Sequence, residues 1–248
     1  MDKFEPVMPG RQSRLQPLPA DSPRATTSDA VLPISQNTVL RNTYWLLALS
    51  LLPSIFGAFV GMELNLAAFY RTSPIMAPLV MLGVMIGSLF VVTRLRNSGW
   101  GVVALFGFTF IAGLALAPTL TYAAGFRNGW QLVGLAAGMT AAIFFTLATI
   151  ATVSKKDFSF MGQFLYAGAI LLLIAFVIAM FFPVPALTLT LSAIAVLIFS
   201  AFILYDISRI IHGGETNYIM ATMALFLDLF NVFINLLNLL LAFSGQRD

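Results

Sequence analysis

The sequence predicts an all-α integral membrane protein that is built as a bundle of seven transmembrane helices. Of its 248 residues, 59% are hydrophobic and only 9% are charged, and the mean hydropathy is +0.92. A soluble globular domain has about 25% charged residues. The few charges also cluster, which leaves long uncharged runs between them. Composition and charge spacing therefore exclude an ordinary soluble domain, and the net charge of +3 gives no reason to expect nucleic acid as a partner.

Each uncharged run can hold one or two membrane helices, because about 20 apolar residues cross the ~30 Å hydrocarbon layer. The run from 157 to 206 is long enough for two helices. Pro183 and Pro185 divide it, since proline ends helices. A last apolar run, from about 221 to 243, supplies the seventh span. The remaining four spans lie in the uncharged runs 41–63, 71–94, 96–127 and 127–155.

Lysine and arginine predict the orientation of the bundle. With seven spans, ten of the 13 cations fall in the N-terminal segment and the connections on its side of the membrane. The positive-inside rule then places the N-terminus in the cytoplasm and the C-terminus on the opposite side. Trp45, Trp100 and Trp130 fall near span ends, as interfacial anchors do. The three outer cations are Arg71, Arg127 and Arg247.

Residues 1–35 differ in composition from the rest of the chain. This segment contains six of the 12 prolines, charges of both signs and few large apolar side chains. Such a segment cannot bury a core, so we expect a disordered cytosolic N-terminal tail followed by one transmembrane domain, residues 36–248. The tail is either inert or a flexible handle for a cytosolic partner. The chain has no cysteine, which excludes disulfides and thiolate chemistry.

Three pairs of glycines have the four-residue spacing that lets membrane helices approach each other closely. We therefore expect close helix contacts at all three pairs, and the bundle should be tightly packed. The pairs are Gly57 and Gly61, Gly83 and Gly87, and Gly134 and Gly138.

The last span carries a polar stripe. Asp228, Asn231, Asn235 and Asn238 are spaced by three, four and three residues, which places them within an arc of roughly 80° on one helix face. Lipid would not favour a carboxylate and three amides, so this face should point into the bundle. Two interpretations stay open: hydrogen bonds that join helices, or a polar pathway for ions.

Asp206 ends the sixth span and can meet Asp228, because a short loop makes the last two spans antiparallel neighbours. Asp228 should be the deeper of the two acids. Asp206 could instead be a solvated helix end paired with Arg209, three residues on. If the acids touch in a low dielectric, they share a proton and form a pH switch or a site for a hard cation such as calcium.

The sequence gives little support for an enzymatic function. His212 and Glu215 are too few ligands for a metal site, and no nucleophile motif accompanies the single histidine. Intramembrane aspartyl proteases also place two aspartates on adjacent spans, and Tyr205 precedes Asp206 here. However, no glycine-x-glycine precedes Asp228. We therefore expect no enzyme, no bound metal and no cofactor.

Several short motifs resemble the Bax inhibitor / YccA family, the transmembrane Bax-inhibitor-motif proteins, and in particular its bacterial YccA-like branch. The resemblance covers about residues 39–248 and is most specific in the last loop and the last helix. The motifs are Val39-Leu40-Arg41-Asn42-Thr43-Tyr44, Lys155-Lys156-Asp157-Phe158-Ser159-Phe160-Met161-Gly162, Leu204-Tyr205-Asp206, Ile210-Ile211-His212-Gly213-Gly214-Glu215-Thr216-Asn217-Tyr218-Ile219, and Leu227-Asp228-Leu229-Phe230-Asn231.

This resemblance implies a seven-helix bundle with the last helix near its centre. It also implies a multi-pass protein of the bacterial inner (plasma) membrane, with a periplasmic C-terminus. Bacterial members modulate the membrane-anchored protease FtsH, as a slow substrate or inhibitor in membrane-protein quality control. The expected partners are thus the lipid bilayer and an FtsH-type membrane AAA protease, and the oligomeric state stays open.

Other family members behave as pH-sensitive calcium leaks, in which Ca²⁺ is the transported ion. A pair of aspartates on the last two helices is their sensor, and Asp206 and Asp228 match those positions. An arginine on the second helix pairs with the acids in those members. By resemblance, Arg94 or Arg96 would supply this counter-charge.

Overall fold

The computed structural model describes residues 32–154 and 156–245, which form seven long helices. All seven are long and apolar enough to cross a membrane, so the predicted all-α class with seven spans is confirmed. Their bounds are α1 Leu32–Glu63, α3 Met76–Leu95, α4 Trp100–Ala124, α5 Gly129–Ser154, α6 Gly162–Phe181, α7 Pro185–Ile211 and α8 Tyr218–Ser244.

Two short elements were not predicted. They are the α-helix α2, Leu66–Thr72, and the 3-10 helix η1, Ser159–Met161. α1 begins at Leu32, four residues before the boundary predicted at residue 36, and its membrane-spanning part is Asn37–Glu63. Of the tail predicted as residues 1–35, residues 1–31 lie outside the described residues, as do Lys155 and Arg247, and residues 32–35 belong to α1.

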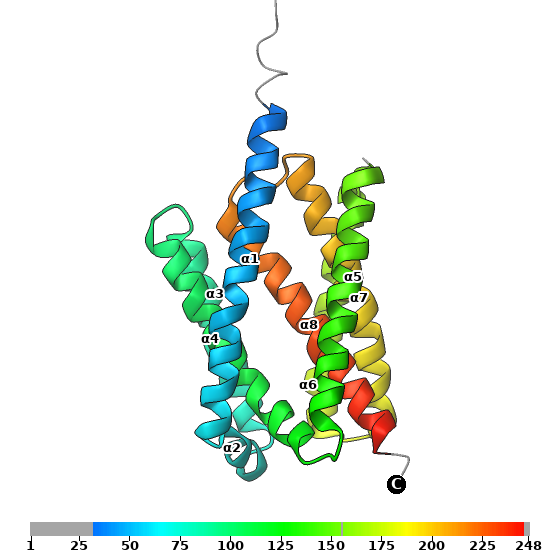
Figure 1. Cartoon of the computed structure of the whole chain (residues 1–248). Coiled ribbons are helices and arrows are strands. Elements are labelled where there is room, and N and C mark those ends of the chain that lie inside the picture. Colours follow the sequence, from blue (N-terminus) through cyan, green and yellow to red (C-terminus); the bar gives the residue numbers. More distant parts are fainter. Residues whose placement is uncertain (1–31, 155, 246–248) are drawn as a thin grey trace, which may run out of the picture.

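α8 is the central helix of the bundle, as the resemblance implies. It packs against α1, α4, α5 and α7. Figure 1 shows α8 running obliquely through the bundle, past α1 near its start and past α5 near its end. α3 lies at the periphery against α2 and α4, and α6 packs on α7 and η1. The polar stripe therefore belongs to a helix that packs against four others.

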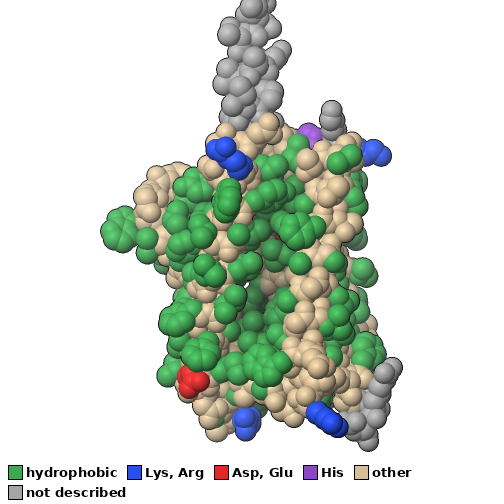
Figure 2. Space-filling model, viewed as in Figure 1, with side chains coloured by type: hydrophobic (Ala, Val, Ile, Leu, Met, Phe, Trp, Pro, Cys, Tyr) green, Lys and Arg blue, Asp and Glu red, His purple; other side chains and the backbone are tan. Residues whose placement is uncertain are grey.

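The core consists of apolar side chains that α8 shares with its neighbours. Phe226 of α8 meets Phe108 of α4 edge to face, with ring centroids 5.9 Å apart. Leu225 and Val232 of α8 and Ile207 of α7 are fully buried. Outward-facing positions are apolar too, and Figure 2 shows hydrophobic side chains along the side wall with lysine and arginine at the two ends. A bundle with this surface matches a lipid environment.

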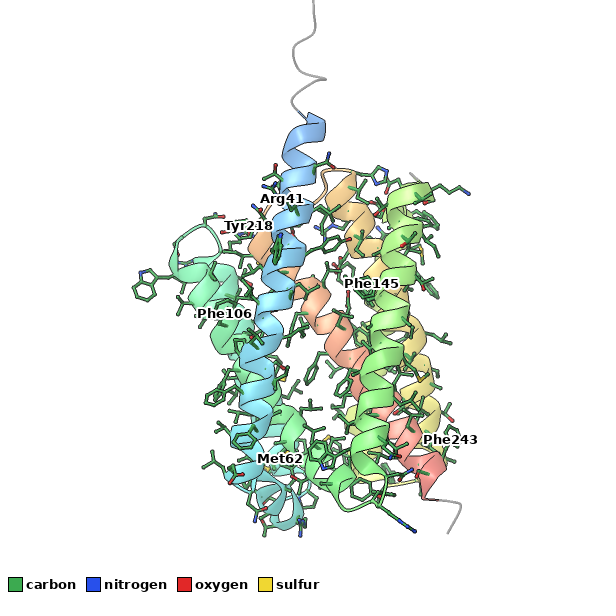
Figure 3. All side chains as sticks on the ribbon, viewed as in Figure 1. Arg41, Met62, Phe106, Phe145, Tyr218 and Phe243 are labelled. Carbon is green, nitrogen blue, oxygen red and sulfur yellow. The ribbon has the colours of Figure 1, made fainter. Side chains whose placement is uncertain are left out.

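The two ends of the bundle are formed by alternate connections. In Figure 3, Arg41 and Tyr218 lie at one end, and Met62 and Phe243 lie at the other. We call these the N-terminal end and the C-terminal end of the bundle. Which of the two faces the cytoplasm stays a prediction from charge.

Glycine allows α1 and α4 to approach each other closely. A Cβ at Gly57 would overlap the carbonyl oxygen of Phe110, and one at Gly113 would overlap the carbonyl oxygen of Ser54. The predicted close contact at Gly57 and Gly61 is therefore present. The other two predicted pairs face open space, since an added Cβ at any of their four glycines meets no atom within 4 Å.

Gly113→Ala is expected to destabilise the bundle, whereas Gly83→Ala should not. The first substitution forces α1 and α4 apart, and overpacking of this kind costs about 1–3 kcal/mol. The second adds a methyl group in open space within a helix, where alanine is favoured over glycine by about 0.5–1 kcal/mol. Thermal unfolding of the purified protein in detergent measures both. Equal melting temperatures for the two variants would contradict the packing described here.

Candidate functional site: a buried carboxyl pair on the last two helices

Asp206 of α7 and Asp228 of α8 lie together inside the bundle. Their exposed fractions are 7% and 5%. The two carboxyl groups are close enough to interact with each other directly. One oxygen of Asp228, Oδ2, is buried and has no hydrogen-bond partner among the described residues. The geometry thus brings together the two acids for which the sequence left contact open.

The crossing of α7 and α8 positions this pair. Asp206 lies five residues before the end of α7, or ~8 Å along its axis, and Asp228 lies ten residues after the start of α8, or ~15 Å. The oblique course of α8 in Figure 1 lets groups at these unequal distances meet. Fully buried Ile207 follows Asp206 directly, and fully buried Leu225 lies three residues before Asp228, so the surroundings are largely apolar. Charges interact strongly in such surroundings.

Arg209 is the only cation that forms an ion pair with either acid within the described residues. Its Nη1 lies 3.9 Å from Asp206 Oδ1, and its Nη2 lies 3.6 Å from Glu215 Oε2. Nη2 also donates to the carbonyl of Gly214 at 3.2 Å, and the guanidinium lies 5.7 Å from the centre of the Tyr205 ring. The predicted pairing of Asp206 with Arg209 is present, but Asp206 is buried rather than solvated.

The two arginines suggested by resemblance are placed differently. Arg94 and Arg96, at the end of α3, have exposed side chains. Within the described residues, α3 packs mainly against α4 and also against α2. Only the backbone carbonyl of Arg96 reaches α8's start, where it accepts from Asn217 Nδ2 at 3.0 Å. Arg209 therefore occupies the position of a counter-charge that Arg94 and Arg96 do not reach.

The asparagines continue along the same helix. Asn235 is buried, and Asn231 and Asn238 are half-buried. Asn231 Nδ2 donates to the carbonyl of Leu227 and Asn235 Nδ2 to the carbonyl of Asn231, both at 2.8 Å. These bonds stay within α8, so they do not join neighbouring helices.

Ser208 ties the connection between α5 and α6 to α7. The backbone N–H of Phe158 donates to Ser208 Oγ at 2.9 Å, and this hydroxyl lies 3.4 Å from the carbonyl of Lys156. His212 Nδ1 lies 2.8 Å from the carbonyl of Ser208. These contacts hold the α5–α6 connection against α7 at the N-terminal end of the bundle, two residues after Asp206. Sequence reasoning missed Ser208, because no local pattern distinguishes it from other serines.

Asn217 fixes the start of α8. Its side-chain oxygen accepts from the backbone N–H groups of Ile219 and Met220, at 3.0 and 3.1 Å. Its Nδ2 donates to the carbonyl of Arg96 and to Asn97 Oδ1, both at 3.0 Å. An asparagine just before an apolar helical run is a known helix-start signal, so this residue could have been found from the sequence.

Asn217→Ala is expected to destabilise the protein by about 1–2 kcal/mol, because it removes a helix cap and the link to the α3–α4 connection. Asn97→Ala removes a single one of these bonds and should cost less. Thermal unfolding of both variants, compared with the unchanged protein, tests this. A smaller loss for Asn217→Ala than for Asn97→Ala would contradict the assigned role.

Two carboxyl groups in this arrangement can share a proton or contact a passing hard cation. Within the described ranges, no three residues of the types His, Cys, Asp or Glu cluster as a metal site would require. The fold and the acid pair together define a multi-pass α-helical membrane protein with an ionisable pair inside its bundle.

The chain belongs to the Bax inhibitor family, since the family described as "Inhibitor of apoptosis-promoting Bax1" matches residues 36–245. Among its relatives is the Escherichia coli K12 protein named "Modulator of FtsH protease YccA", 38% identical over 218 residues, which cover 87% of this chain and 95% of the relative. An uncharacterized membrane protein of Vibrio cholerae is 41% identical over 86% of this chain and 93% of its own length. An uncharacterized protein of Pseudomonas aeruginosa is 42% identical over 81% and 87%.

Proposed function

We propose that this protein is a modulator of an FtsH-type membrane protease in the bacterial inner membrane. The observation that carries the proposal is the 38% identity to the Escherichia coli relative named for that role, over 95% of the relative's length. A second strain's relative is named an inner membrane protein. The predicted orientation puts the N-terminus in the cytoplasm, where the ATPase of such a protease would engage it.

The composition of the chain suits a slow substrate or inhibitor. The proline-rich segment 1–35 lacks the apolar residues needed for a core, which is a suitable starting point for an unfolding machine. The bundle that follows is held by close helix contacts such as Gly57 and Gly113, and it would resist extraction. The test is turnover of the chain by a purified FtsH-type protease, with and without residues 1–30. Unchanged turnover of the shortened chain would count against the proposal.

A second candidate function is a pH-sensitive leak for calcium or another cation, gated by protonation of the acid pair. It is supported by the contact between Asp206 and Asp228 inside the bundle, with Oδ2 of Asp228 left without a partner. Asn231, Asn235 and Asn238 would extend a polar path along α8. Calcium flux into proteoliposomes, followed across pH, tests this function. The two functions are compatible, because one uses the tail and the other uses the bundle.

A further inference from the structure

A cavity of about 500 Å³ opens at the C-terminal end of the bundle, away from the acid pair. One wall comes from the short helix α2, with Tyr70 and Arg71, and the other comes from the last turns of α4, with Pro118 and Tyr122. Phe126, in the turn after α4, completes it and meets the Tyr122 ring edge to face at 5.2 Å. The volume lies within the range of small-molecule sites.

The cavity crosses the boundary between span and loop. Pro118 and Tyr122 belong to the membrane-spanning part of α4, whereas Arg71 lies in the connection between two spans. Tyr122 is exposed. Tyrosines are enriched at the level of lipid headgroups, where one end of the side chain is apolar and the other is hydrated. A molecule seated here would have its apolar part beside α4 and its polar part beside α2.

The polar groups of the cavity suit an anion. Arg71 lines it, and within the described residues this guanidinium has no carboxylate partner. A guanidinium binds phosphate through paired N–H donors. The phenol of Tyr70 is a hydrogen-bond donor at neutral pH, and burial raises its pKa further. No aspartate or glutamate lines the cavity, so a headgroup that also carries an ammonium ion finds no partner for it there.

We propose that this cavity binds an acidic phospholipid, with its phosphate on Arg71 and its glycerol and first acyl carbons against Pro118 and Phe126. The lipid would fill the gap between α2 and α4 at the headgroup level. The site is independent of the acid pair and of any protease partner.

Native mass spectrometry of the full-length protein with added phosphatidylglycerol or phosphatidylethanolamine tests the proposal. Arg71→Gln should weaken phosphatidylglycerol binding about tenfold, and Arg71→Lys should restore part of it. Thr121→Phe, which fills the cavity but keeps Arg71, should also lower binding. Arg127→Gln is the matched control, because Arg127 lies at the same end of the bundle but lines a different cavity. It should leave phosphatidylglycerol binding unchanged.

Three results would overturn the proposal. An equal loss in Arg127→Gln would indicate general surface charge. Displacement of phosphatidylglycerol by millimolar inorganic phosphate would indicate a simple anion site, because the apolar half would then contribute nothing. Equal binding of phosphatidylglycerol and phosphatidylethanolamine by the unchanged protein would show that the net charge of the lipid does not determine binding. If Thr121→Phe fails to fold, the exposed Arg71 variants still decide the outcome.

Discussion

Removal of residues 1–30 is expected to abolish turnover of this chain by an FtsH-type protease. An ATP-dependent protease has to grip a segment before it can pull on a folded domain, and the composition of the first 35 residues predicts the part of the chain that cannot fold by itself. The first span is formed by residues 37–63, so the deletion leaves every span intact. The measurement is the degradation rate of the purified protein in proteoliposomes that also contain the protease.

The matched control replaces residues 1–30 by a glycine-serine segment of equal length, which should restore turnover if the tail acts as a flexible handle. The shortened protein should keep the melting temperature of the full chain, which separates loss of the handle from loss of the fold. It should also no longer slow the degradation of a second membrane substrate. Degradation of the shortened chain at the full rate would remove the tail from the mechanism.

Asp228→Asn is expected to abolish the pH dependence of calcium flux in proteoliposomes. Asparagine keeps the shape of the side chain but cannot ionise, so Asp206 is left as a single acid and the proton shared by the pair is lost. Asp206→Asn should have the same effect, because the two carboxyl groups act as one titrating unit. Among the described residues, the charged groups that face this unit are Arg209, which pairs with Asp206, and Glu215, which shares that arginine. The phenol of Tyr166 also interacts with Asp206.

Asp157→Asn is the matched control for charge. Asp157 is an exposed acid in the connection between α5 and α6, and hydrogen bonds with Ser159 lower the pKa of its carboxyl group. Because a lowered pKa keeps it ionised from about pH 5 to 8, its removal should not alter the shape of the flux curve. Identical flux curves for Asp228→Asn and the unchanged protein would contradict the leak. If Asp228→Asn changed the melting temperature but not the flux curve, the acid pair would have a structural role only.

Much of the architecture follows from the sequence because a membrane makes each span a local property. An uncharged run of about 20 residues must cross the hydrocarbon layer whatever its neighbours do. The seven spans could therefore be placed from the positions of charges, prolines and apolar runs, and Pro185 indeed begins α7. The seven-residue helix α2 was missed, because one or two helical turns are too short to show a periodic pattern in the sequence.

The candidate site depended on features that no single segment contains. The sequence by itself determined the spans, the polar stripe of α8 and the presence of two acids near each other in topology. Only the tertiary structure decided that Asp206 and Asp228 touch, that Arg209 rather than Arg94 or Arg96 pairs with them, and that Gly57 is packed while Gly83 faces outward. The reason is that helix tilt and choice of neighbour set these contacts, and both arise from packing between segments distant in the chain.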